Sequence, residues 1–142
     1  MEVRDAVETD APAIAEIADA PADAMRRTIH DRTVRVAVAD DTVSDPNADT
    51  SDDETPLVGF VSFDATDGTV HVTQLGGTEA ACQQLLGEPM RFAAGEGMAV
   101  ELLVVDGDDT ARRAVEDAGF DRIGAGPRFD GRATTRYRTE SP

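Results

Sequence analysis

The chain has 142 residues, which is enough for one compact domain with its own hydrophobic core. It carries 29 acidic residues against 13 basic ones, and its formal net charge is −16. A chain this acidic is not expected to bind nucleic acid, and no apolar run approaches the roughly 20 residues of a membrane-spanning helix.

Four elements are predicted in the first third of the chain. Apolar and polar residues alternate over residues 2–7, which predicts a short strand. Asp10 is a suitable N-cap for a helix whose apolar residues recur at helical spacing. A second helix is expected to begin at Pro21 and to end near His30. Residues 33–39, TVRVAVA, are typical of a β-strand.

The segment 40–56 differs from its surroundings. It holds seven acidic residues, two Pro and no basic residue. Such a segment cannot bury a core, so we expect a mobile loop that joins two strands, the second over residues 57–63. We interpret its charge as a solubility feature rather than as a binding site.

A strand and a long helix are predicted next. The strand covers residues 69–75, and the Gly pair at 76–77 interrupts its pattern. A helix is expected over 78–94, with a kink or a break at Gly87 and Pro89, because proline removes a helical hydrogen bond.

The strongest strand signal is the segment 98–105, which is apolar except for Glu101. This pattern predicts a central strand that is buried on both faces. Asp108 or Asp109 is then expected to cap a helix that runs through Asp117.

Two short strands, over residues 120–123 and 133–138, complete the chain. The predicted order is strand, helix, helix, three strands, helix, strand, helix, two strands. This order predicts a single α/β domain over residues 1–142, with a mixed sheet of about seven strands flanked by about four helices.

The absence of lysine indicates that the protein works in concentrated salt. All 13 basic residues are Arg, and Asp alone occurs 19 times. Because concentrated salt screens carboxylate repulsion within ~3 Å at about 1 M, we interpret the chain as a cytoplasmic protein of a salt-accumulating halophile. An acidic protein of an ordinary cytoplasm is the alternative.

The N-terminus lacks the features of a signal peptide. The chain has a single cysteine and two distant histidines, so neither a disulfide nor a metal site is predicted.

The charge is unevenly distributed. Residues 1–109 carry 6 Arg and 24 acidic residues, a net −18, whereas residues 110–142 carry 7 Arg and 5 acidic residues, a net +2. One interpretation is that these Arg residues pair with neighbouring acids. The other is a surface for an anionic ligand. The residues at its centre would be Arg112, Arg113, Arg128 and Arg132.

Three local patterns accompany the element order. The first comprises Val3, Arg4, Ala6, Asp10, Ile14 and Ile17; the second Val70, Val72, Gly76, Gly77, Leu85 and Leu86; the third Asp108, Ala111, Val115, Gly119 and Phe120. Together with the order of elements, they resemble the GNAT N-acetyltransferase superfamily over essentially the whole chain. The resemblance implies acetyl-CoA as co-substrate and an amine as acetyl acceptor.

In that family an Arg or Gln followed by small residues lets a helix N-terminus hold the pyrophosphate of the cofactor. One register places this pattern on Gly77, Ala80 and Cys82, so that Gly77 replaces the basic or amide residue. The other begins at Gln74 and places Glu79 at the last small position, where its charge would repel a pyrophosphate. The chain departs from the family pattern in either register.

The resemblance implies a set of site residues. Those expected to bind the cofactor are Val72, Gly76, Gly77, Thr78, Ala80, Ala81, Cys82 and Asp108. The family's tyrosine, which protonates the departing thiolate, is replaced by Val115, and the only tyrosine, Tyr137, is expected to pack on the last strand. The candidates for the base that deprotonates the amine are His71 and Glu101. Each also has a structural interpretation: a half-buried strand histidine, and a carboxylate paired with an Arg.

Three functional hypotheses follow. The first is an acetyl-CoA-dependent transferase acting on a small-molecule or peptide amine, in which a homodimer would be a common assembly. The second is a non-catalytic module of the same fold that binds CoA weakly or binds a partner protein. The third is an unrelated α/β domain, which would be excluded if two central parallel strands diverge beside Gly76 and Gly77.

Overall fold

The computed structural model describes residues 2–39, 57–128 and 131–140, so the acidic segment 40–56 and its expected mobility lie outside the described residues. The elements are β1 (Glu2–Asp5), the 3-10 turn η1 (Glu8–Asp10), α1 (Ala11–Ala18), α2 (Ala22–Asp31), β2 (Thr33–Val38), β3 (Leu57–Thr66), β4 (Thr69–Gly77), α3 (Glu79–Glu96), β5 (Ala99–Val105), α4 (Asp109–Asp117), β6 (Asp121–Ala125) and β7 (Thr134–Thr139). The predicted order of strands and helices is confirmed.

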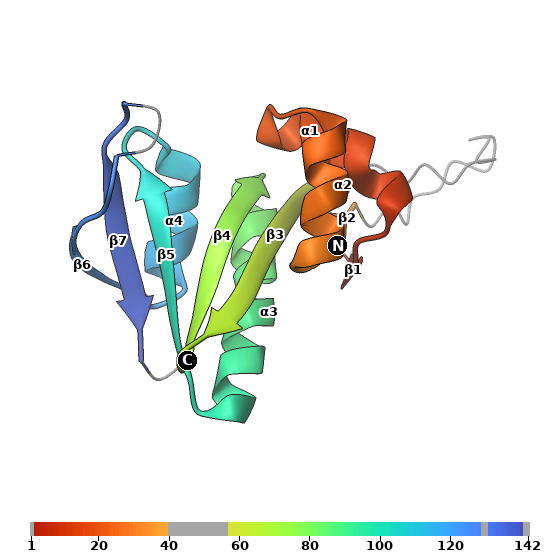
Figure 1. Ribbon diagram of the computed structural model, residues 1–142. Helices are drawn as coiled ribbons and strands as arrows, with labels where there is room; N and C mark the ends of the chain where they lie inside the picture. Colours follow the sequence, from red (N-terminus) through yellow and green to blue (C-terminus); the bar gives the residue numbers. More distant parts are fainter. Residues whose placement is uncertain (1, 40–56, 129–130, 141–142) are drawn as a thin grey trace.

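One seven-stranded mixed sheet organises the molecule, in the order β1-β2-β3-β4-β5-β7-β6. The helices α1 and α2 cover one face over β1 to β3, and α3 and α4 cover the other face (Figure 1). Apolar strand residues alternate between the two layers: Phe60 packs under α1, whereas its neighbour Val61 packs in the core with Leu85 of α3. Within the described ranges, no helix is both long and apolar enough to cross a bilayer.

The parallel pairing of β4 with β5 is short. It runs from Thr69 opposite Ala99 to Val72 opposite Leu102 and then ends, although both strands continue. Figure 1 shows the arrowheads of β4 and β5 diverging. We call this unpaired part of the two strands, beyond Val72 and Leu102, the splay. It lies beside Gly76 and Gly77, as the acetyltransferase resemblance requires, and it excludes the unrelated α/β domain.

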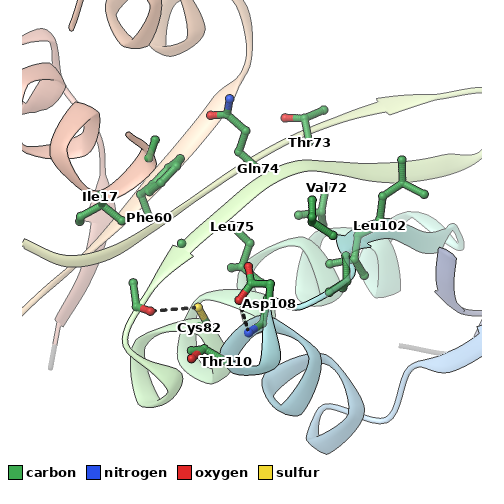
Figure 2. A pocket seen from close by; sticks show the side chains of 17 residues that line it. Ile17, Phe60, Val72, Thr73, Gln74, Leu75, Cys82, Leu102, Asp108 and Thr110 are labelled. Atoms are coloured by element: carbon green, nitrogen blue, oxygen red, sulfur yellow. Dashed lines mark hydrogen bonds between the residues drawn. The ribbon is translucent and has the colours of Figure 1, made fainter. Parts of the chain in front are cut away.

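A β-bulge lies where the splay begins. Phe63 of β3 pairs with Val72, but Ser62, the residue before it, pairs with Gln74. Thr73 is therefore an extra residue on β4 without a register partner on β3. The Thr73 hydroxyl donates to the Ser62 carbonyl at 3.1 Å and is 2.8 Å from the Ser62 hydroxyl. The bulge turns Gln74 to the same side of the sheet as Thr73, as Figure 2 shows.

The pair Gly76 and Gly77 does not end β4. Both residues are part of the strand and pair with Phe60 and Gly59 of β3. Gly77 has φ +124°, and a Cβ at this position would lie 2.2 Å from the Val58 carbonyl oxygen. The close approach of β3 therefore requires a glycine here.

Two local expectations are corrected. Pro89 neither ends nor splits α3, which continues through it as one helix with Pro89 buried. Asp10 stands at the N-cap of α1, but its side chain does not cap that helix. It instead accepts two hydrogen bonds from Arg4, at 2.8 and 3.0 Å, and one from the Val7 N–H at 2.8 Å. The bonds from Arg4 are the main reason that the pKa of Asp10 is lowered.

Candidate active site

A cavity of about 470 Å³ opens at the splay. We call it the helix-side cavity, because its wall, formed mostly by β4 and β5, also includes residues at the starts of α3 and α4 (Figure 2). Val72 and Leu102 lie where the two strands part, and Cys82 and Asp108 approach from the helices. The cavity therefore joins the edge of an interrupted sheet to two helix N-termini.

These helix N-termini are suited to hold an anion. Thr78 caps α3 by accepting the Ala81 N–H at 3.1 Å, and Asp108 caps α4 by accepting the Ala111 N–H at 3.2 Å. A helix leaves its first amides without intrahelical partners, but the Asp109 N–H of α4 already donates to the Gly107 carbonyl at 3.0 Å. The positive ends of both helices lie beside one cavity, and Asp108 adds a carboxylate to its wall.

An ion pair changes the electrostatics at the start of α3. Glu79, which the sequence indicated as a source of repulsion, accepts a hydrogen bond from Arg113 Nε of α4 at 2.9 Å. This bond raises the pKa of Arg113. The guanidinium thus stands beside the N-terminus of α3, close to where Gly77 fails to supply a basic group. The Arg112–Arg113 pair stands out in the sequence, but its position beside α3 depends on how the two helices pack.

The residues predicted to bind a cofactor divide into two groups. Those that line the helix-side cavity are Val72, Gly76, Gly77, Cys82 and Asp108. Thr78 caps the helix, Ala80 is exposed in its first turn, and Ala81 is buried in the core. The Cys82 thiol is 1% exposed, and burial is the main reason that its pKa is raised to about 11. It is therefore a neutral packing group at ordinary pH.

A second cavity, of about 610 Å³, lies on the opposite face of β4, β5 and β7. We call it the sheet-face cavity; its lining includes His71, Glu101 and Arg136. The two cavities meet at the splay, and the residues common to both are Val72, Thr73, Gln74, Leu102, Leu103 and Val105. The expectation that β5 is buried on both faces is corrected, because its residues on this side are only half-buried.

The two candidate bases lie side by side in the sheet-face cavity. His71 and Glu101 are register partners on β4 and β5, one residue before the splay. A Glu101 carboxylate oxygen accepts a hydrogen bond from Arg138 Nη1 at 3.1 Å, which confirms the expected Arg partner. The bonds to Glu101 and then Glu140 raise the pKa of Arg138. Within the described residues His71 has no salt-bridge partner, and it lines the sheet-face cavity.

The position of the family's tyrosine contains no acid. Val115 is fully buried in the core and has no proton to donate. Tyr137 is 2% exposed, and its hydroxyl donates to Glu116 of α4 at 3.1 Å. Burial, followed by that bond, raises the pKa of Tyr137. Tyr137 packs in the core, as predicted, but its strand β7 lies between β5 and β6 and not at the edge of the sheet. Tyr137 also lines a third cavity, of about 250 Å³.

The described residues contain no group of three or more His, Cys, Asp or Glu side chains arranged to hold a metal ion. No protein-family model matches the sequence, and no curated protein matches it significantly.

The fold, by contrast, has many counterparts among solved structures. An aminoglycoside 6'-N-acetyltransferase complexed with coenzyme A superposes with a TM-score of 0.72 at 12% identity, over 98% of this chain and 96% of that chain. Nourseothricin acetyltransferase gives 0.71 at 19% identity, over 99% and 98%. A GNAT-family acetyltransferase from Bacillus cereus gives 0.68 at 13% identity, over 97% and 95%. The chain has the fold of GNAT acetyltransferases.

Proposed function

We propose that this chain is an acetyl-CoA-dependent N-acetyltransferase that acts on the amine of a small molecule or peptide. The observation that carries the proposal is the splay, with two helix N-termini on one side and a cavity lined by ionisable side chains on the other. An anionic cofactor and an amine could enter from opposite sides and meet between β4 and β5.

The helix-side cavity fits the cofactor. The unpaired N–H groups at the start of α3 would bind the pyrophosphate, and Arg113 would add the charge that Gly77 lacks. Val72 and the β4 backbone beyond it would bind the chain that leads to the acetyl group, since this edge of β4 has no strand partner. The cofactor supplies an acetyl group activated as a thioester.

The residues around the splay support direct transfer. A backbone N–H of β4 beyond Val72 would polarise the thioester carbonyl. His71 would accept a proton from the amine as the new C–N bond forms and the C–S bond breaks. Solvent would protonate the leaving thiolate, because Val115 stands in place of the tyrosine.

A second candidate function is a non-catalytic module of the same fold. It is favoured by Val115 and by the missing basic residue at Gly77. Such a module would bind CoA weakly, or a partner protein, without transferring an acetyl group.

Titration of acetyl-CoA and CoA by calorimetry tests the proposal. The titration belongs in concentrated KCl, because the lysine-free acidic composition indicates a halophilic protein. Specific binding is expected, and no binding at millimolar ligand would exclude the transferase. Acetyl transfer to a panel of amines then separates the enzyme from the module, which would bind CoA without releasing it from acetyl-CoA.

A further inference from the structure

Two polar atoms in the described part of the chain are buried without a hydrogen-bond partner: Gln74 Oε1 and Arg136 Nε. Both residues line the sheet-face cavity. Buried polar groups are almost always paired in folded proteins. One of these atoms accepts a hydrogen bond and the other donates one. Both atoms are closed off from solvent, so a ligand in this cavity reaches them only when the two side chains move toward it; such a ligand would bring a donor to Gln74 and an acceptor to Arg136.

Gln74 lies where the acetyl group would be transferred. It lines both cavities, two residues beyond Val72, the last residue of β4 that pairs with β5. The bulge at Thr73 turns Gln74 toward the side from which the acceptor would enter (Figure 2). A donor that reaches its Oε1 would therefore be the N–H of the reacting amine.

Arg136 differs from the other arginines of the sheet-face cavity. Arg32 pairs with Asp64, and Arg138, the next β7 residue on this face, pairs with Glu101 and Glu140. Among the described residues, no carboxylate lies within salt-bridge distance of Arg136. In a chain with 29 acidic residues and 13 Arg, a half-buried guanidinium without a carboxylate needs a reason.

We propose that the acceptor is a small molecule of the amino-acid type, with a carboxylate a few atoms from its amine. This inference rests on the transferase function proposed above. Arg136 binds the carboxylate through its planar fork of N–H groups. Gln74 accepts an N–H of the amine beside the splay, and His71 removes the proton.

The dimensions agree with a short ligand. At Val72 and Leu102, the last pair before the splay, neighbouring strands lie about 4.8 Å apart, so β4 and β7 are about 10 Å apart there and farther apart beyond it. Arg136 is the register partner of Leu103 of β5, and both residues line the cavity. A volume of about 610 Å³ is in the range of small-molecule pockets.

The charges of the cavity argue against a polycationic acceptor. Glu101 is the only carboxylate among the described lining residues, and Arg138 already binds it. Arg32 and Arg136 also line the cavity. A molecule with several ammonium groups would meet more cations than anions here, whereas a molecule with one carboxylate would find an uncommitted guanidinium.

Binding of reaction products tests this inference without requiring turnover. The probes are N-acetylated amino acids with small, aliphatic and aromatic side chains, each compared with its carboxamide, and O-phosphoethanolamine as a phosphate counterpart. Calorimetry with the wild-type chain should show at least one carboxylate bound about tenfold or more tightly than its amide. Arg136→Gln should abolish this preference. Arg136→Lys, which keeps the charge but loses the fork, should lose most of it.

The matched control is Arg91→Gln, an exposed arginine of α3 that pairs with Glu88 and does not line the sheet-face cavity; this variant should keep the preference. Equal binding of acids and amides, no binding of any probe, tighter binding of the phosphate, or a preference that survives in a folded Arg136→Gln would each overturn the inference. A CoA titration in the same samples separates the two proposals. CoA binding without acid preference removes only the inference, whereas acid preference without CoA binding removes the transferase and leaves a carboxylate-binding cavity without an acceptor role.

Discussion

The two sides of the splay differ in the chemical groups that line their cavities. On the helix side, the lining side chains are mainly apolar or small, and the polar groups that face the cavity include the backbone of the unpaired edge of β4. On the sheet face they are side chains, among them His71, Gln74, Glu101 and Arg136. Both sides meet at the same two strands.

This difference explains how the chain can depart from the family pattern and keep the site. A site made of backbone amides depends on where strands and helices end, so Gly77 in place of a basic residue leaves most of it intact. A site made of side chains changes with each substitution. We expect the helix side to be tolerant and the sheet face to determine the chemistry and the acceptor.

The largest effect is expected at His71 on the sheet face. His71→Gln should lower kcat/KM for acetyl transfer by about 100-fold or more, because a general base contributes about 10²–10⁴. Binding of CoA should remain as in the wild type, since the substitution lies outside the helix-side cavity. His30→Gln is the control, because His30 is an exposed histidine that contacts Glu8. Equal rates for both variants would remove His71 from the mechanism.

Gly77 tests whether the helix side depends on backbone geometry. Gly77→Ala should lower the free energy of unfolding by about 3 kcal/mol, because its Cβ would overlap the Val58 carbonyl and its φ is positive. Gly95→Ala in α3, where a Cβ meets nothing within 4 Å, should instead raise it by up to about 1 kcal/mol. Denaturation in concentrated KCl measures both. An unchanged stability in Gly77→Ala, with weaker CoA binding, would assign this glycine to the phosphate alone.

The sequence predicted the order of elements because each has its own periodicity and terminal residues. The strand at Ala99–Val105 is nearly all apolar, and Asp108 caps α4 as expected. The two candidate bases, His71 and Glu101, are neighbours because they are register partners in the short parallel pairing of β4 with β5, and their catalytic role stays a prediction.

What the sequence did not reveal depends on register between distant segments. The bulge at Thr73 is a single extra residue with no pattern of its own, yet it decides the face of Gln74. Arg113 and Glu79 are 34 residues apart, and their pairing depends on how α4 packs against α3. Arg136 could be distinguished from the other arginines only after their partners were known.

A moderate effect is expected from the charges at the start of α3. Glu79→Gln should tighten CoA binding about two- to fivefold, because it removes a negative charge from the first helical turn and releases Arg113. Arg113→Gln should weaken binding to a similar degree. Arg112→Gln is the control, since Arg112 pairs with Asp109 and Glu116 on α4 itself. Calorimetry at the lowest KCl concentration that keeps the chain folded is required, because salt screens exposed charges. Weaker binding in Glu79→Gln would contradict this account.

The smallest effect is expected at Cys82, whose side chain lines the helix-side cavity. Its pKa is raised to about 11, so below that pH the thiol is neutral and should react slowly with iodoacetamide at pH 8, faster as the pH approaches 11. Cys82→Ala should change CoA affinity less than about twofold and cost about 1 kcal/mol of stability, because it removes one buried atom. Rapid alkylation at pH 8, or loss of CoA binding in Cys82→Ala, would show that the helix side depends on this side chain after all. Retained binding would mean that a cofactor site made of strand edges and helix ends tolerates the loss of a side chain from its wall.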